Sequence, residues 1–287
     1  MGLGNDTLEK PLSVITGATS GLGAALVDCC ARAGHLIIGV GRQEKELALM
    51  TERAKALGAA SIVPVRADLS TLDGRATVIN AAANIPNNRR YLFNIAGTYV
   101  SDTTIKANPQ ERELLYAIKA GAANDLLRAP YPKLFIGGKA FQVLPWTSVV
   151  YSGSQAQLIE LHNSSEYARA NNLGTLSHLV ARLAVGVDAK TVYFGNLEGA
   201  TADSFNLGKD EIVPIKVAAN EMLAAALDPS LIAAIVLPRV KDAPAGECVQ
   251  KRELRTGEYA LESDQMLMLY EGLLHERFSS MVLPKFG

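Results

Sequence analysis

The chain has 287 residues, of which 48% are hydrophobic and 20% charged, and its formal net charge is -1. This balance predicts a well-packed globular protein, and the near-zero charge argues against nucleic acid or an anionic membrane as partner. No apolar run approaches the roughly 20 residues that span a bilayer, and the N-terminus shows no secretory signal. Three cysteines and four scattered histidines favour neither a disulfide framework nor a metal site. We therefore expect a cytoplasmic protein.

Short apolar runs alternate with longer helical patterns from the start of the chain. The runs are nearly continuous rather than alternating, as expected of strands buried on both faces. We predict strands at 12–16, 36–40, 62–65, 91–93, 148–151 and 191–194, and helices at 21–33, 44–57, 73–84, 109–127 and 166–184. This rhythm predicts an α/β fold, a doubly wound parallel sheet with right-handed crossovers and helices on both faces.

The chain shows no internal repeat and no flexible linker, so we expect one domain over residues 1–287. From about residue 197 the rhythm is lost, and helical patterns at 221–227 and 263–275 stand among loops. This variable region is expected either to shape the substrate pocket as a lid or to form a plain C-terminal extension.

The first predicted strand runs directly into a glycine-rich turn, and a helix follows. Glycine allows a sharp bend and a close approach to phosphate, while the helix start presents N–H groups and the positive end of its dipole. In this context the turn predicts a Rossmann-type site for a dinucleotide diphosphate. Its cofactor-binding residues would be Gly17, Thr19, Ser20, Gly21, Leu22 and Gly23. The alternative is an ordinary glycine-rich turn between a strand and a helix.

The end of the second predicted strand indicates which dinucleotide binds. A site that prefers NAD places an acidic residue here for the ribose 2′-hydroxyl. This sequence has Gly41 and Arg42 instead. No carboxylate would repel a 2′-phosphate, and the guanidinium can pair with one. We therefore predict NADP(H) as cofactor; the alternative is that Arg42 is only a solvated loop charge.

Together with later motifs, these features resemble the short-chain dehydrogenase/reductase family over about residues 10–200. The turn is similar to the family's TGxxxGxG segment, and Asp68-Leu69 resembles the pair that lies beside the adenine. Asn94-Ile95-Ala96-Gly97 resembles the family's NNAG motif, with Ile95 in place of the second Asn. The resemblance implies further cofactor contacts from Asp68, Leu69, Asn94, Ala96 and Gly97.

The family's catalytic serine and tyrosine have counterparts in Ser154 and Tyr167, which are separated by the usual twelve residues. The resemblance implies that the Tyr167 hydroxyl gives a proton to a carbonyl oxygen as hydride arrives, and that Ser154 hydrogen-bonds the same oxygen. A phenol with a pKa of about 10 needs a nearby cation to exchange protons near neutral pH. The alternative is that Tyr167 is a packed helix tyrosine. Nearby Tyr151 and Ser152 are expected to be structural.

The lysine that should supply this cation is missing, because the family's YxxxK motif has become YxxxN with Asn171. Asn171 lies one turn beyond Tyr167 and can still hydrogen-bond the ribose, but it is neutral. Counting without a gap from Asn94 places Lys119 where the family carries an active-site Asn, which steadies a water leading to the lysine. We hypothesise that Lys119 supplies the missing cation from the opposite helix. The alternative is a solvated surface lysine and a decayed site.

Weaker matches follow. Gly195-Asn196 occupies the place of the family's Pro-Gly turn near the nicotinamide, and Thr201 is a candidate pyrophosphate or carboxamide contact. His162 either faces the substrate or is an exposed loop residue. His178 is most simply a packed or interface residue.

The resemblance implies an NADPH-dependent oxidoreductase that reduces a small-molecule carbonyl or oxidises the alcohol. One alternative is a related enzyme with altered chemistry, such as ene-reduction, dehydration or another non-redox reaction. The other is a catalytically lapsed NADP(H)-binding regulatory protein. The helices at 109–127 and 166–184 are those with which such proteins form homodimers or homotetramers. The second carries an apolar stripe at helical spacing, formed by Leu173, Leu176, Val180 and Leu183.

Overall fold

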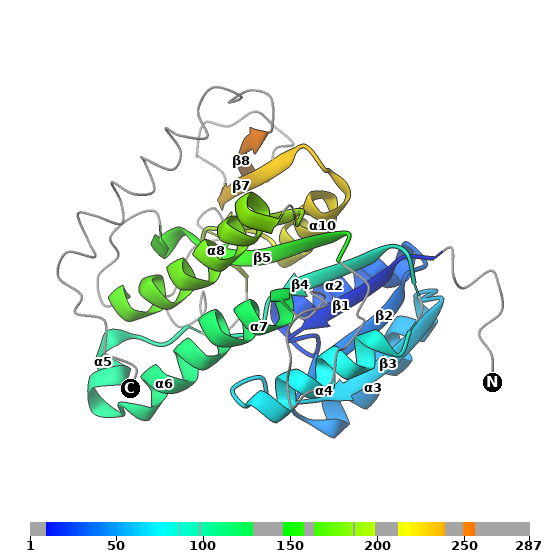
Figure 1. The fold of residues 1–287 in the computed structure, drawn as a ribbon, viewed down its shortest axis with the longest axis horizontal. Helices are drawn as coiled ribbons and strands as arrows, with labels where there is room; N and C mark the ends of the chain where they lie inside the picture. The colour runs from blue at the N-terminus through cyan, green and yellow to red at the C-terminus, as the bar shows by residue number, and fades with distance from the viewer. Residues whose placement is uncertain are drawn as a thin grey trace.

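Eight strands form one sheet in the part of the chain that the structure, a computed structural model, describes. The described residues are 10–85, 87–97, 99–128, 146–157, 164–185, 187–198, 212–238 and 249–255. The strand order is β3-β2-β1-β4-β5-β6-β7-β8 (Figure 1). Every neighbouring pair is parallel except β7 and β8, which run antiparallel. The doubly wound parallel sheet is thus confirmed, with one antiparallel strand added.

The strands and helices predicted up to residue 194 lie where the sequence placed them, apart from shifts at their ends. The strands are β1 (Leu12–Thr16), β2 (Leu36–Gly41), β3 (Ser61–Arg66), β4 (Arg90–Asn94), β5 (Ser148–Ser154), β6 (Ala189–Phe194), β7 (Leu231–Pro238) and β8 (Val249–Arg255). The helices are α2 (Gly21–Arg32), α3 (Glu44–Ala56), α4 (Leu72–Ala83), α5 (Asp102–Ala107), α6 (Gln110–Tyr116), α7 (Ala123–Arg128), α8 (Ser165–Val185) and α10 (Ile215–Leu227). The π-helix η1 (Ala117–Ala122) connects α6 to α7, and the 3₁₀-helix η2 (Gln155–Gln157) follows β5.

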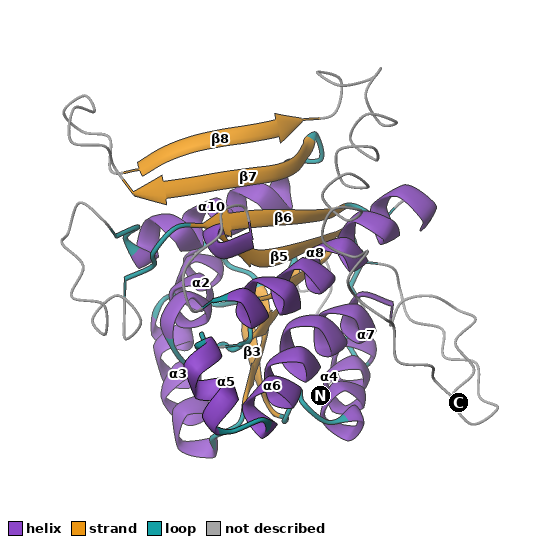
Figure 2. Cartoon of the chain, turned by 90° about the vertical axis from the view of Figure 1, so that its left-hand side faces the viewer, coloured by secondary structure: helices purple, strands orange, loops and turns teal. Residues whose placement is uncertain are grey.

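Two layers of helices bury the two faces of the sheet, because successive side chains of each strand point to opposite sides. Ile15 of β1 packs in a cluster with residues of α2, α3 and α10. Leu12 and Val14 of the same strand pack in a second cluster with residues of α4, α7 and α8. Figure 2 shows α2 and α3 on one side of the strands and α4 and α7 on the other. The inner strands β1, β2, β4 and β6 are buried throughout.

Strand β3 corrects the expectation that all predicted strands are buried on both faces. It lies at one edge of the sheet, and most of its residues are exposed or only partly buried. Pro64 lies in this strand. Proline donates no backbone hydrogen bond, and it is therefore tolerated at a sheet edge.

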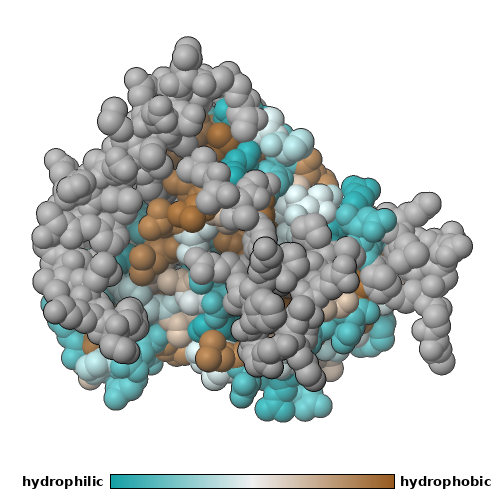
Figure 3. Space-filling view, in the orientation of Figure 1, coloured by the Kyte–Doolittle hydropathy of each residue, from teal (hydrophilic) through white to brown (hydrophobic). Residues whose placement is uncertain are grey.

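The apolar stripe of α8 does not form the buried face of this helix. The buried face of α8 carries small and polar residues instead: Ala168, Asn171, Gly174, Thr175, His178 and Ala181. Val180 of the stripe is 47% exposed, and Leu173 and Leu176 are half-buried. Figure 3 shows hydrophobic atoms gathered where Figure 1 draws α8.

The region after residue 197 is more regular than the sequence indicated. Helix α10 begins at Ile215 rather than at residue 221, and strands β7 and β8 were not predicted. The helical pattern at 263–275 lies outside the described residues. Within the described part of the chain, no helix has both the length and the apolarity to cross a bilayer.

Arg90, the first residue of β4, holds the end of α4 against the sheet. Its buried guanidinium donates to the carbonyl oxygens of Asn87, Ala82 and Ile85. We expect Arg90→Met to lower the free energy of unfolding by about 2–4 kcal/mol, since three buried acceptors lose their donors. Urea unfolding measures this change. The control is Arg89→Met at the exposed neighbouring position, where a loss comparable to that of Arg90→Met would contradict the prediction.

Candidate active site

The predicted site residues of β1 to β5 meet at the carboxyl edge of the sheet, where parallel α/β sheets bind their ligands. Thr16, the last residue of β1, joins two of these segments through its hydroxyl. The hydroxyl donates to the carbonyl of Phe93 at 3.1 Å. It also accepts from the backbone N–H groups of Ile95 at 2.9 Å and Ala96 at 3.0 Å. The glycine-rich turn and the Asn94–Gly97 loop are therefore held as one unit.

The glycines of the turn have separate tasks. Gly17 has a φ of 67°, and a Cβ there would lie 3.1 Å from the Cα of Ala96. A Cβ on Gly23 would lie 2.0 Å from the carbonyl oxygen of Gly17, so only glycine lets α2 start this close to the turn. Gly21 has a φ of 51° and open space where a Cβ would be. The turn therefore fits a diphosphate, with bare backbone on its open side.

Helix α2 begins beside this open side without a side-chain cap. The N-cap residue Ser20 makes no side-chain hydrogen bond to the helix start, and the first turn contains no acidic residue. Leu22 is buried in the core beneath, so only its backbone faces the turn. The N–H groups of the first turn are thus left for an anion.

The predicted 2′-phosphate site lies at the end of β2. A Cβ on Gly41 would lie 2.7 Å from the Cγ2 of Thr19, so a side chain here would have to displace the Thr19 methyl group. Arg42 is exposed. The carboxylate of Asp68, after β3, accepts from the N–H and the hydroxyl of Ser70 at 2.9 and 2.7 Å. These bonds, and less strongly the charge of Arg42, lower the pKa of Asp68. Leu69 is buried beside it.

The side chain of Asn94 makes its hydrogen bonds within the protein. Its amide donates to the carbonyl of Ala123 at 3.5 Å and to Nε2 of His178 at 3.2 Å. Nδ1 of His178 lies 2.8 Å from the carbonyl of Gly174, so this nitrogen carries the hydrogen and Nε2 accepts. Burial lowers the pKa of His178 to about 4. His178 is a neutral packed residue, one of the two expectations for it, and Asn94 ties β4 to α7 and α8.

Ser154 ends β5 and is positioned by a residue that the sequence analysis missed. The Gln157 side chain accepts from the Ser154 N–H at 2.7 Å. Its amide nitrogen donates to Asn172 at 3.1 Å and to Thr175 at 3.0 Å, both on α8. Gln157 therefore fixes the end of β5 against the helix that carries Tyr167. No sequence pattern marks a glutamine close to a candidate serine as a residue that positions it.

Tyr167 lies in the first turns of α8, near Ser154 and Asn171. Its ring meets the ring of Tyr99 edge-on, with 5.3 Å between centroids and 69° between planes. Burial raises the pKa of Tyr167, and hydrogen bonding with Asn171 and Ser154 partly offsets this. The structure thus brings the three predicted residues together in surroundings that disfavour the phenolate.

Asn171 is buried and connects α8 to the opposite helix through Tyr151. Its amide nitrogen donates to the Tyr167 carbonyl at 2.8 Å, and its oxygen accepts from the Tyr151 hydroxyl at 3.1 Å. The same hydroxyl lies 3.2 Å from the carbonyl oxygen of Lys119. Tyr151 therefore links the two exchanged positions, and the Asn171 amide is already engaged within the protein.

Lys119 lies inside the π-helix η1, and its side chain is only 5% exposed. The Nζ atom is 5.9 Å from the ring centroids of both Tyr151 and Tyr167. A Cβ on Gly97, whose φ is 133°, would lie 2.4 Å from the Lys119 Cε, so the lysine runs directly over this glycine. Burial lowers the Lys119 pKa to about 8. The alternative of a solvated surface lysine is therefore wrong.

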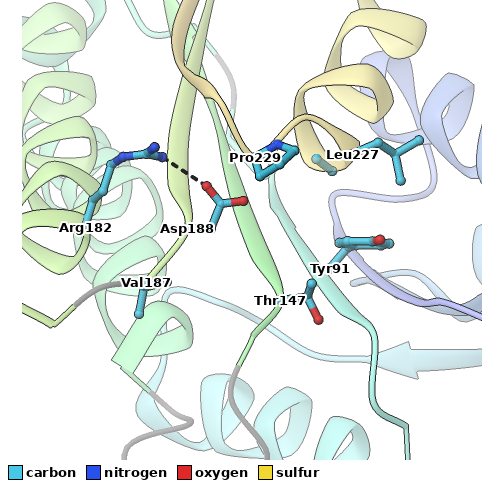
Figure 4. A pocket seen from close by; sticks show the side chains of 8 residues that line it. Tyr91, Thr147, Arg182, Val187, Asp188, Leu227 and Pro229 are labelled. Atoms are coloured by element: carbon cyan, nitrogen blue, oxygen red, sulfur yellow. Dashed lines mark hydrogen bonds and ion pairs between the residues drawn. The ribbon is translucent and has the colours of Figure 1, made fainter. Parts of the chain in front are cut away.

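Three further candidates were predicted from the sequence. His162 and Thr201 are outside the described residues, and Gly195 follows β6 with its N–H bonded to the Val236 carbonyl at 2.9 Å. A hollow of about 520 Å³ opens near the amino ends of β4 to β7 (Figure 4). The ion pair of Arg182 and Asp188, 3.0 Å long, lies at its wall. None of the predicted site residues lines it.

The family model for short chain dehydrogenases matches residues 12–168. The chain belongs to the short-chain dehydrogenase family. It is 25% identical over 179 residues to a tropinone reductase homolog from Datura stramonium, covering 62% of this chain and 63% of that protein. It is 37% identical over 84 residues to 11-beta-hydroxysteroid dehydrogenase A from Sesamum indicum, covering 29% and 24%. The chain thus matches less than two thirds of the length of either relative.

Solved structures share the fold at low sequence identity. A short-chain dehydrogenase from Sphingobium yanoikuyae in complex with NADPH has a TM-score of 0.67 at 18% identity, covering 96% of this chain and all 100% of that one. The L-sorbose reductase of Gluconobacter frateurii, complexed with NADPH and L-sorbose, has a TM-score of 0.64 at 17% identity, with 83% and 98% covered.

The burial of Lys119 is directly measurable. We expect its amine to titrate at about 8, because the charged form loses hydration inside the site. Competitive acetylation followed by peptide mass spectrometry measures this midpoint. The exposed Lys106 in the same digest is the reference. A Lys119 amine that titrates at the ordinary lysine value of 10.5, or above it, would contradict the buried geometry.

Proposed function

We propose that the protein is an NADPH-dependent oxidoreductase that reduces the carbonyl group of a small molecule or oxidises the corresponding alcohol. One observation carries the proposal: the buried Lys119 amine lies beside the ring of Tyr167, which itself lies near Ser154. A phenol, a hydroxyl and a cation are the groups that proton exchange with a carbonyl oxygen requires. The NADPH complexes among the structural neighbours support the same chemistry.

The dinucleotide would lie along the carboxyl edge of the sheet. The N–H groups of the turn at Gly17–Gly23 would hold the diphosphate and Arg42 the 2′-phosphate. Asp68 and Leu69 would lie beside the adenine, and Ala96 and Gly97 along the ribose. When bound, the nicotinamide supplies or accepts the hydride.

The protein side chains would handle the proton. In reduction, the Tyr167 hydroxyl donates to the carbonyl oxygen, and the Ser154 hydroxyl donates a hydrogen bond to the same oxygen. Burial raises the pKa of Tyr167 and so opposes formation of the phenolate. A cationic Lys119 favours the phenolate and therefore lowers the barrier to proton transfer. Asn171 and Tyr151 would keep the two helices together through the contacts of the Tyr151 hydroxyl.

A homodimer or homotetramer is part of the proposal. The exposed side of α8 presents Val180, Leu173 and Leu176, and a second copy of the chain is the partner expected there.

Cofactor preference tests the role of Arg42. We expect Arg42→Ala to weaken NADPH binding about 10–100-fold, because a charge-assisted pair with the 2′-phosphate contributes about 1.5–3 kcal/mol. NADH, which lacks this phosphate, should bind as before. Fluorescence titration measures both dissociation constants. Arg66→Ala, an exposed arginine at the end of β3, is the matched control. Equal losses of affinity for NADPH and NADH would show that Arg42 does not bind the 2′-phosphate.

The pH profile of carbonyl reduction tests Lys119. A lysine is charged below its pKa, so the wild-type rate should fall as the pH rises through about 8, where Lys119 loses its charge. Lys119→Met should lower kcat about 10²–10³-fold and remove this basic limb. Tyr167→Phe should abolish turnover, and Lys106→Met should change nothing. The assay follows NADPH absorbance over a panel of ketones.

Two outcomes would redirect the proposal. Unchanged turnover in Lys119→Met would rule out the hypothesis that Lys119 takes over the role of the missing lysine. NADPH binding without consumption, whatever carbonyl is offered, would favour the regulatory binding protein, and products other than alcohols would favour altered chemistry.

A further inference from the structure

Arg75 joins the loop after β3 to the helix that carries Lys119. Its Nε donates to the Leu69 carbonyl at 2.8 Å, and Nη2 donates to the carbonyls of Ala117 at 2.8 Å and Ser70 at 3.3 Å. Its Nη1 pairs with the Asp125 carboxylate at 2.7 Å. The residue is 9% exposed. One guanidinium thus holds three backbone carbonyls from two segments that are distant in sequence.

The contact with Ala117 lies at the first residue of the π-helix. A π-helix inserts one extra residue into the helical turn, which disturbs the regular carbonyl pairing and is seldom stable alone. Arg75 supplies an external donor at this point. Gly121, inside the same π-helix, leaves the room for it, since a Cβ there would lie 2.9 Å from Nη2 and 3.1 Å from Nη1.

The π-helix affects the direction of the Lys119 side chain, because Lys119 lies within it. The π-helix contains Lys119 between Ala117 and Gly121, and this segment sends the lysine side chain inward over Gly97. A regular helical turn would rotate the residues beyond the insertion relative to those before it. Support of the π-helix is therefore support for the inward position of the amine.

We propose that Arg75 is a positioning residue, which keeps Lys119 directed into the active site and couples it to the Asp68–Leu69 loop. The proposal rests on the proposed function, in which that loop holds the adenine end of NADPH. Loss of the guanidinium fork releases the π-helix and moves the Lys119 amine toward water. It also loosens the loop and weakens NADPH binding.

The test uses the full-length protein and Arg75→Lys. Lysine keeps the positive charge beside Asp125, but it is a point donor and cannot span the carbonyls of Leu69 and Ala117 together. We expect the titration midpoint of Lys119, followed by competitive acetylation, to move from about 8 toward its ordinary value of 10.5. We expect the dissociation constant of NADPH to rise several-fold.

Gly121→Ala is a second variant, which leaves Arg75 in place and presses a methyl group on its guanidinium. This variant should shift the titration midpoint of Lys119 in the same direction. It keeps the test decisive if Arg75→Lys does not fold. Asp125→Asn is the control, because it removes the ion pair but leaves the carbonyl bonds of Arg75. In this control Lys119 should titrate as in the wild type.

A purely structural role has a different signature. Folded variants of Arg75 and Gly121 that lose thermal stability, while Lys119 still titrates at about 8, would overturn the proposal. The acetylation readout needs no turnover. A protein that reduces no carbonyl would therefore sink the proposed function and leave the result on Arg75 intact.

Discussion

The burial of one lysine amine is the constraint around which the candidate site is arranged. An ammonium group inside a protein loses hydration, and burial is the cause of the lowered pKa of Lys119. The chain accommodates the amine with two phenol rings at equal distance and with a glycine beneath its side chain. Such an arrangement is costly to keep in a protein without a use for the charge. This cost supports the proposed role of Lys119 as the cation of the site.

The family frame is retained, and the proposed exchange of a lysine and an asparagine lies within it. The turn after β1, the Asn94–Gly97 loop and the pair of Ser154 and Tyr167 all lie at one edge of the sheet. The lysine comes from η1 and the asparagine from α8, and the Tyr151 hydroxyl lies within hydrogen-bonding distance of both positions. A residue expected to be merely structural is thus the link between the exchanged pair. The proposed exchange therefore comes with a polar connection between the two helices.

Sequence patterns predicted the parts of this protein that depend on local chemistry. The buried strands, the glycine turn and the spacing of Ser154 from Tyr167 are visible because their signals lie within a few residues of each other. The gapless count from Asn94 also placed Lys119 opposite Asn171. That Lys119 is buried needed the structure, because exposure depends on the neighbours Tyr151 and Tyr167.

Other features have no local signal. The π-helix has the same residue pattern as a regular helix, and the contacts of Arg75 and Gln157 join segments far apart in sequence. Strand β8 is rich in charged residues and was read as part of a loop, because an edge strand has little core to face. In α8 small and polar residues form the buried face, and the helical spacing of the larger apolar residues did not reveal this.

The charges of β8 also bear on how this protein avoids unwanted assembly. Lys251 pairs with Glu221 and Glu253, and Arg255 pairs with Asp228 and Glu253. Another molecule that added a strand to this border would have to strip water from these ions and disturb their pairing. Growth of the sheet into fibres, or exchange of strands between chains, is therefore resisted at β8.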